Sequence, residues 1–202
     1  MGGGADSRIP GLLRSAFAET EGRIVVRTYD FDPETGHRQI LGWVRELQPD
    51  LLIGESLGSI QALRIPDIPQ LYVSPSLGAP RYLYRLAWIP LLPGGAALLH
   101  WLWPVKEGDR QRLRFEYAVL RKYKAHWKAA REAAAKPCFR YAFFGKRDHY
   151  KKWGIVSVSA WRKMFGDTFQ EYDGTHFMEE NHVLSLLVPK IREILGEPAD
   201  GS

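Results

Sequence analysis

Apolar and polar residues alternate along the chain with two periods, one typical of strands and one typical of helices. Runs rich in β-branched and aromatic residues predict strands at residues 23–31, 50–56, 68–76, 138–148 and 168–176. Apolar residues three and four positions apart predict helices at residues 9–20, 36–49 and 179–195. Pro189 is expected to bend or restart the last helix. The alternation favours an α/β fold with a mostly parallel central sheet and helices on both faces.

Residues 77–136 interrupt this alternation between two predicted strands. Residues 86–103 contain no Asp, Glu, Lys or Arg, and their 18 positions reach the lower limit for a membrane span. Pro90 and a Pro-Gly-Gly turn at residues 93–95 break this run, which favours two short apolar helices instead. Residues 107–136 predict a long amphipathic helix. The segment is expected to form a helical cap over a binding cleft, or alternatively a satellite core of packed aromatic side chains.

The composition is that of an ordinary globular protein, with 45% hydrophobic and 25% charged residues among 202. We expect residues 1–202 to form one domain, with residues 77–136 as its insertion. The first residues lack the pattern of a secretory signal. The single cysteine, Cys138, excludes an internal disulfide, so a cytoplasmic location is expected.

Positive charge is concentrated in residues 105–152, which hold 15 Lys or Arg against five Asp or Glu, while the whole chain carries +5. A basic surface suits an acidic ligand or an anionic membrane, so peripheral membrane contact is one expectation. A solvated helix face is the plainer alternative. No nucleic-acid-binding signature accompanies the basic residues, so nucleic acid is not favoured as a partner. Nothing in the pattern indicates an oligomeric state.

Ser56 lies in the pentapeptide Gly-Glu-Ser-Leu-Gly at residues 54–58, between a predicted strand and a helix-compatible segment. A nucleophile at a tight strand-to-helix turn has strained backbone angles and needs small flanking residues. The helix that follows points its N-terminal amides at developing negative charge. Short motifs also arise by chance, so an ordinary structural turn at Ser56 is the alternative.

A serine hydroxyl needs a base, and the base needs a carboxylate that orients it. Asp148 and His176 end two consecutive predicted strands, in the order that follows such a serine. Because the carboxyl ends of parallel strands meet at one edge of a sheet, the three side chains are expected to lie together. Other residues could take the place of the base or the acid, but they are less well placed. His149 is next to Asp148 and His182 lies inside the last helix, while Asp167 and Asp173 do not lie at the expected strand end.

With these residues identified, the chain resembles a small serine hydrolase of the α/β-hydrolase fold, of the esterase or thioesterase kind, over essentially its whole length. The resemblance rests on glycine-rich or strand-end segments at residues 2–7, 54–58, 145–148 and 173–177. It implies Ser56 as the nucleophile, His176 as general base and then acid, and Asp148 as the partner that orients His176. It implies no cofactor and no metal.

The same resemblance implies an oxyanion hole made by the backbone N–H of Leu57 with that of Gly4 or Ala5. In such hydrolases the glycine-rich loop follows a central strand, which would lie between the strands predicted at residues 23–31 and 50–56. Only Met1 precedes the glycines here, so that strand is expected to be missing. Restoring roughly five to ten apolar residues upstream is expected to stabilise the protein.

The expected function is hydrolysis of a carboxylic ester or thioester through an acyl-enzyme intermediate. The apolar insertion favours an acyl or aromatic group in a small-molecule substrate, and the basic helix favours a negatively charged head group. The residues expected to contact substrate are Glu55, Trp88, Trp101 and Trp103. The alternatives are an amide or carbon–carbon hydrolase on the same triad, and a non-catalytic protein whose aromatic insertion binds a partner or a membrane.

Overall fold

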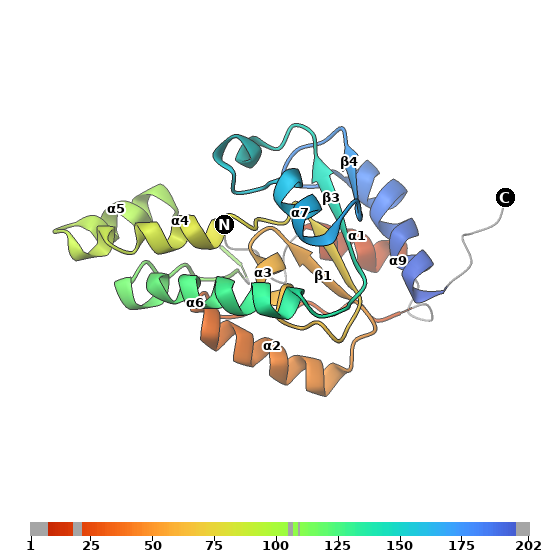
Figure 1. The fold of residues 1–202 in the computed structure, drawn as a ribbon, viewed down its shortest axis with the longest axis horizontal. Coiled ribbons are helices and arrows are strands. Elements are labelled where there is room, and N and C mark those ends of the chain that lie inside the picture. Colours follow the sequence, from red (N-terminus) through yellow and green to blue (C-terminus); the bar gives the residue numbers. More distant parts are fainter. Residues whose placement is uncertain (1–7, 18–21, 105–106, 109, 197–202) are drawn as a thin grey trace.

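The computed structural model describes residues 8–17, 22–104, 107–108 and 110–196 (Figure 1). Within these ranges, one parallel sheet has its strands in chain order: β1 (Leu52–Glu55), β2 (Gln70–Val73), β3 (Arg140–Gly145) and β4 (Phe169–Tyr172). The pairing is in register, with Leu71 opposite Ile53 on one side and Tyr141 on the other. Four of the predicted strands are thus confirmed, and their carboxyl ends meet at one edge of the sheet.

Helices cover both faces of the sheet, because side chains alternate along each strand (Figure 1). Leu71 and Val73 of β2 belong to the cluster on one face, and Tyr72 belongs to the cluster on the other. The helices of the first face are α1 (Arg8–Ala16) and α9 (Val188–Leu195), and those of the second are α3 (Gly58–Leu63), α6 (Tyr117–Ala134) and α7 (Val158–Phe165). Burial on both sides explains why β2 and β3 are apolar along most of their length.

Helix α2 (Pro33–Leu47) begins earlier than predicted because Asp32 caps it. The Asp32 carboxylate accepts hydrogen bonds from the N–H groups of Glu34 and Thr35, at 3.1 and 3.2 Å. Lys122 of α6 pairs with the same carboxylate and so ties the two helices together. Burial alone raises the pKa of Asp32, but the bonds from Lys122 and the two N–H groups hold the pKa below its ordinary value.

The last helical segment changes its winding immediately before Pro189, as the sequence predicts. It consists of α8 (Glu180–His182), the π-helical stretch η3 (Val183–Leu187) and α9. A proline lacks an N–H and clashes with the carbonyl one turn before it. The wider π turn places Pro189 in the first turn of α9, where neither problem arises.

The segment between β2 and β3 forms helices that project away from the sheet (Figure 1). Besides α6, these are α4 (Ala79–Leu86), the 3₁₀ turn η1 (Ile89–Leu91) and α5 (Gly95–Leu102). Of the two short apolar helices predicted within residues 86–103, the second is α5 and the first is only the 3₁₀ turn η1, and Gly94 turns the chain between them with a φ of +73°. They share with α6 a buried cluster that includes Leu83, Leu99 and Phe115. No helix in the described ranges is long and apolar enough to cross a membrane.

The helix predicted over residues 107–136 is wrong in its first part, because α6 begins only at Tyr117. Residues 110–116 are not helical. Leu113 and Phe115 of this stretch are both buried in the cluster beneath the cap. Burial at alternate positions has the period of extended backbone, and one face of a helix does not provide it.

The strand predicted at residues 23–31 is also wrong. Residues 22–30 form no ladder with the four described strands and lie opposite β1 across a cavity. A run of β-branched residues pairs only where a neighbouring strand presents free backbone groups. Ile24 and Val26 are half-buried in the cavity wall instead.

A buried polar contact joins α6 to residues of α2 and the end of α3. The His126 side chain is 1% exposed, and its Nδ1 accepts a hydrogen bond from Arg64 Nη1 at 2.8 Å. Arg64 also donates to Glu34 Oε1 at 3.2 Å. Because arginine is always a donor, His126 carries its proton on Nε2 and is neutral. Burial, with the positive charges of Arg64 and His37, lowers the pKa of His126 to about 3.

We expect acid to destabilise the protein through His126. An unfolded histidine titrates near 6.5 and the folded ring at about 3, so unfolding binds a proton in that window and stability falls as pH falls through it. The loss from His126 is roughly 2 kcal/mol between about pH 6.5 and 4.5, measurable by denaturant unfolding. His126→Gln keeps an acceptor for Arg64 and should flatten this slope, whereas His100→Gln, at an exposed position, should keep it. An unchanged slope in His126→Gln would contradict the assignment.

Candidate active site

Ser56 occupies a strained turn between β1 and α3. Its φ is +50°, a left-handed value that is unfavourable for a residue with a side chain. Backbone hydrogen bonds hold this turn: Ser56 N–H donates to Val73 O at 3.0 Å, and Ser56 O accepts from Ser59 and Ser76 at 3.2 and 3.1 Å. The side chain is thereby raised at the carboxyl edge of the sheet.

The two glycines that flank this turn have different roles. A Cβ on Gly54 would lie 3.0 Å from Ser59 Cα and 3.2 Å from a ring carbon of Tyr72, so α3 crosses β1 too closely for a larger residue. A Cβ on Gly58 would meet only the Tyr29 hydroxyl, at an ordinary 3.5 Å. Packing therefore favours glycine at position 54, whereas it leaves ordinary contact distance for a Cβ at position 58.

Ser56, His176 and Asp148 form one hydrogen-bonded chain. Ser56 Oγ lies 2.9 Å from His176 Nε2, and His176 Nδ1 lies 2.8 Å from Asp148 Oδ2. An ionised carboxylate only accepts, so His176 carries its proton on Nδ1 and Nε2 is free to accept the serine proton. Both His176 and Asp148 are buried, which strengthens these bonds. Ser76 Oγ is a further neighbour of the serine hydroxyl, at 3.2 Å.

Asp148 is fixed by the turn that follows β3. Its Oδ1 accepts a hydrogen bond from Tyr150 N–H at 2.8 Å and caps the 3₁₀ turn η2 (His149–Trp153). Burial alone raises the pKa of the Asp148 carboxyl, yet the hydrogen bonds from His176 and from Tyr150 N–H hold the pKa below its ordinary value. The carboxylate therefore stays ionised at neutral pH and can orient His176.

The loop that carries His176 packs tightly on the end of β3. A side chain on Gly145 would overlap the carbonyl oxygens of Thr175 and Gly174, so only glycine allows this approach. The ring of Tyr150 lies against His176 with centroids 4.6 Å apart, and Phe177 covers it at 5.1 Å. These contacts leave the imidazole little freedom to rotate.

The rival residues take part in other contacts. His182 Nδ1 pairs with Glu179 Oε2 at 3.4 Å, and the His149 ring stacks on Tyr150 at 4.0 Å. The rival acids form surface ion pairs, Asp173 with Arg147 and Asp167 with Arg162. None of the four is hydrogen-bonded to Ser56 in the described part of the chain.

Only one of the three expected oxyanion donors lies among the described residues. Leu57 follows Ser56 and precedes the first residue of α3, and its N–H donates to no group in the described residues. The other expected donors, Gly4 and Ala5, lie outside the described residues. No group of three His, Cys, Asp or Glu side chains in the described ranges is arranged to hold a metal ion.

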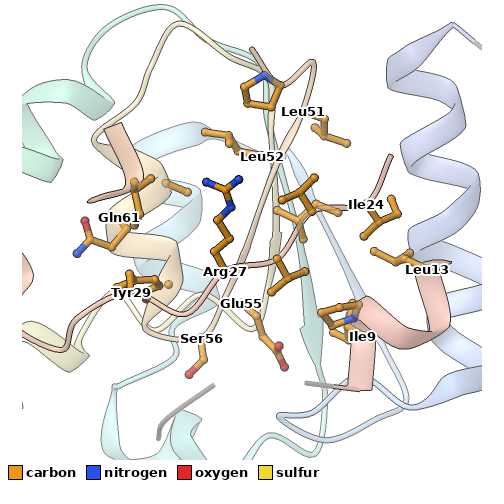
Figure 2. A pocket seen from close by; sticks show the side chains of 18 of the residues that line it. Ile9, Leu13, Ile24, Arg27, Tyr29, Leu51, Leu52, Glu55, Ser56 and Gln61 are labelled. Atoms are coloured by element: carbon orange, nitrogen blue, oxygen red, sulfur yellow. The ribbon is translucent and has the colours of Figure 1, made fainter. Parts of the chain in front are cut away.

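A cavity of about 1060 Å³ opens beside this site (Figure 2). Ser56 and Glu55 lie at one end, and Leu51 and Leu52 lie toward the other. Glu55, expected to contact substrate, is one of the residues that line this cavity. Burial raises the pKa of its carboxyl, although the positive charges of Arg8 and Arg110 act in the opposite direction.

The three tryptophans predicted to bind substrate do not line this cavity. Trp88 and Trp101 are 56% and 76% exposed, and the Trp103 ring packs on Phe115 at 5.6 Å within the cap. They lie elsewhere because the cap helices project away from the sheet (Figure 1). Sequence reasoning instead overlooked Tyr150 and Phe177, two aromatic residues one or two positions from the predicted triad that do line it.

Comparisons with known proteins bear on the fold. No protein-family model and no curated protein matches the sequence. One similar solved structure comes from work on LipS and LipT, two metagenome-derived lipolytic enzymes. Its TM-score against this chain is 0.55 and its sequence identity is 15%, and the match covers 93% of this chain and 89% of that one. A structure from work on carboxylesterases of Nitrososphaera gargenis has a TM-score of 0.47 and 12% identity, over 84% and 74%. The first likeness and the topology agree: the chain has the α/β-hydrolase fold.

Gly145→Ala is expected to displace the loop that carries His176. The added methyl group overlaps the backbone of the loop that carries His176, so the imidazole must move away from Ser56. A shift of about 1 Å slows a reaction that depends on this geometry roughly a hundredfold. The measurement is the rate at which a fluorophosphonate probe labels Ser56. Gly42→Ala, in α2 where nothing lies within 4 Å, is the matched control and should keep the rate; a wild-type rate in Gly145→Ala would refute the argument.

Proposed function

We propose that the protein is a serine hydrolase that cleaves a carboxylic ester or thioester through an acyl-enzyme intermediate. The observation that carries the proposal is the chain of hydrogen bonds from Ser56 Oγ through His176 to Asp148, at 2.9 and 2.8 Å. The serine has the strained φ that a nucleophile needs to project from a strand-to-helix turn. The α/β-hydrolase fold is compatible with this chemistry, but the proposal rests on the geometry of the site.

In the first half of the reaction, Ser56 Oγ attacks the carbonyl carbon of the substrate. His176 Nε2 takes the hydroxyl proton as the new C–O bond forms, and the Asp148 carboxylate stabilises the resulting imidazolium through Nδ1–H. The same proton then passes from Nε2 to the leaving alcohol or thiol. The acyl group remains on Ser56 as an ester.

In the second half, a water molecule gives its proton to His176 Nε2 and attacks the acyl carbon. The tetrahedral intermediate collapses, the carboxylic acid leaves, and the proton returns to Ser56 Oγ. Negative charge on the carbonyl oxygen is stabilised in both halves by the N–H of Leu57, at the start of α3. The second hydrogen-bond donor to this oxygen is proposed, from the resemblance to serine hydrolases, to be the backbone N–H of Gly4 or Ala5.

The substrate is proposed to be a small-molecule acyl ester or thioester that binds at the mouth of the cavity. Leu57, Tyr150 and Phe177 supply apolar surface around Ser56, which suits an acyl or aromatic group. The description of one similar structure as lipolytic agrees with an apolar acyl group in that protein. Cleavage of an amide or a carbon–carbon bond would use the same residues, and substrate panels distinguish these reactions.

A fluorophosphonate probe is expected to label the wild-type protein and not Ser56→Ala. Hydrolysis of p-nitrophenyl butyrate should fall by a factor of about 10⁴ or more in Ser56→Ala, because no other group can form the acyl-enzyme. Ser76→Ala is the matched control, since Ser76 Oγ lies 3.2 Å from the nucleophile yet outside the relay to Asp148. It should keep both labelling and turnover within about tenfold.

Two outcomes would count against the proposal. Labelling that persists in Ser56→Ala would place the nucleophile elsewhere. A wild-type protein that is neither labelled nor active on esters or thioesters would favour a binding role instead.

We further propose, as a second candidate function, that the cap attaches the protein to an anionic membrane surface. The supporting observation is a group of exposed apolar side chains on η1, α5 and the residues beside η1, in which Trp88, Leu92 and Trp101 are 56%, 63% and 76% exposed. Tryptophan and leucine are the side chains that enter the lipid interface. Basic side chains adjoin this face on α6, where Arg121 and Lys124 lie over the rings of Tyr117 and Tyr84.

Trp101→Glu is expected to weaken co-sedimentation with phosphatidylcholine–phosphatidylserine vesicles by about tenfold or more, because a charge must then enter the interface. The control is Phe139→Glu, another exposed aromatic residue, which precedes β3 at the opposite edge of the sheet from Ser56. Binding should also weaken at high salt and on vesicles without phosphatidylserine. Equal binding by both variants, or no binding by the wild type, would refute membrane attachment.

A further inference from the structure

The loop that connects β4 to α8, residues 173–179, carries His176 to the side of Ser56. A shift of this loop would move the imidazole, so the groups that hold its backbone decide the geometry of the site. On the side of β3, Arg147 N–H donates to Gly174 O at 2.9 Å. A second set of bonds comes from within the loop itself.

The side chain of Glu179, at the end of the loop, folds back onto the residue before His176. Glu179 Oε1 accepts a hydrogen bond from Thr175 N–H at 3.1 Å and another from Thr175 Oγ1 at 3.0 Å. The same hydroxyl also lies 3.2 Å from Phe177 O, on the other side of the histidine. One carboxylate oxygen therefore fixes both the backbone and the side chain next to the imidazole.

The second oxygen of this carboxylate, Oε2, is enclosed by the protein. It is buried without a hydrogen-bond partner in the described part of the chain, and the buried His182 Nδ1 lies 3.4 Å from it. The His182 ring packs on Tyr172 with centroids 4.8 Å apart. A Cβ on Gly174 would overlap both Oε2 and the Tyr172 ring, so the carboxylate occupies space that a larger residue would need.

The Glu179 carboxyl is ionised at neutral pH. Burial alone raises the pKa of this carboxyl, but hydrogen bonds from backbone N–H groups and the Thr175 hydroxyl, with His182 beside it, hold the pKa below its ordinary value. An ionised acceptor forms stronger hydrogen bonds than a neutral one. The bonds from Thr175 are therefore suited to hold the loop.

We propose that Glu179 is a positioning residue: by accepting both hydrogen bonds from Thr175, it fixes the loop that carries His176. The imidazole is thereby kept within reach of Ser56 on one side and of Asp148 on the other. This role rests on the proposed function, because the position of the imidazole affects a rate only if Ser56 reacts. Glu179 acts through the backbone of the loop.

The first test compares Glu179→Ala with Glu179→Gln, which loses the charge but keeps an oxygen that can accept from Thr175. In Glu179→Ala, a fluorophosphonate probe should label Ser56 about tenfold or more slowly, because the imidazole is displaced. Glu179→Gln should restore the rate to within about threefold of wild type. Glu180→Ala, at the exposed neighbouring position, is the matched control and should keep the wild-type rate.

A second measurement follows His176 without any reaction. Asp148 selects the ring tautomer that carries its proton on Nδ1, and ¹⁵N NMR distinguishes the two tautomers of a neutral ring. In a Ser56→Ala background at about pH 9, where imidazole rings are neutral, Glu179→Ala should shift this ring toward a mixture of tautomers. The other two variants should keep the proton on Nδ1. Thr175→Val, which loses only the hydroxyl bond, should shift the ring less, and it decides the matter if Glu179→Ala does not fold.

The contrary results are distinct. A wild-type rate and an unchanged tautomer in Glu179→Ala would overturn the proposal. Equal impairment in Glu179→Gln would mean that the charge acts, and not hydrogen-bond acceptance, and equal impairment in Glu180→Ala would mean that α8 is loosened as a whole. Slower labelling with an unchanged tautomer would assign the effect to the cavity, which Glu179 also lines.

The two proposals can fail separately. A tautomer shift in Glu179→Ala, in a protein that no probe labels at Ser56, would support the positioning of His176 and refute the hydrolase. Labelling of the wild type with no effect of Glu179→Ala would do the reverse.

Discussion

The parallel pairing of the four described strands is the constraint on which the candidate site depends. Ser56 and His176 are 120 residues apart, and Asp148 and His176 are 28 apart. Each follows the carboxyl end of a different strand, and only parallel strands in matched register bring these ends to one edge. The ladder continues past the strand ends, with Ser56 N–H bonded to Val73 O and Lys146 N–H to Tyr172 O. The loops that carry the triad are thus fixed to the sheet.

Within the described ranges, the same sheet leaves β1, the strand that precedes Ser56, open on one side. The hydrogen bonds of the triad come from β1, β3, β4 and their loops, so they form without any group on the open side. The proposed hydrolysis also needs backbone donors for the developing oxyanion, and two of the proposed donors, Gly4 and Ala5, lie outside the described residues. The chain of hydrogen bonds at Ser56 and the proposed oxyanion hole are therefore separate requirements.

The sequence predicted those parts of the site that depend on local pattern. An apolar run that ends in Gly-x-Ser or in a polar residue marks a strand end, and three such ends located Ser56, Asp148 and His176. Pattern could not reveal that residues 22–30 form no ladder with the four described strands, because β-branched residues look the same with or without a neighbouring strand. Nor could it give the direction of the cap, which leaves Trp101 in solvent instead of over Ser56. Helix α7 escaped prediction because it is short, although Ser157 caps it.

The most direct test of the central claim is to trap the acyl-enzyme. The protein is mixed with p-nitrophenyl acetate, quenched in acid within its first turnovers, and analysed by intact-mass and peptide mass spectrometry. The account predicts one acetyl group per chain, on the peptide that contains Ser56, and its loss on further incubation. An acetyl group on Cys138 or on a lysine instead, or turnover of the ester with no acyl adduct at any time, would contradict it.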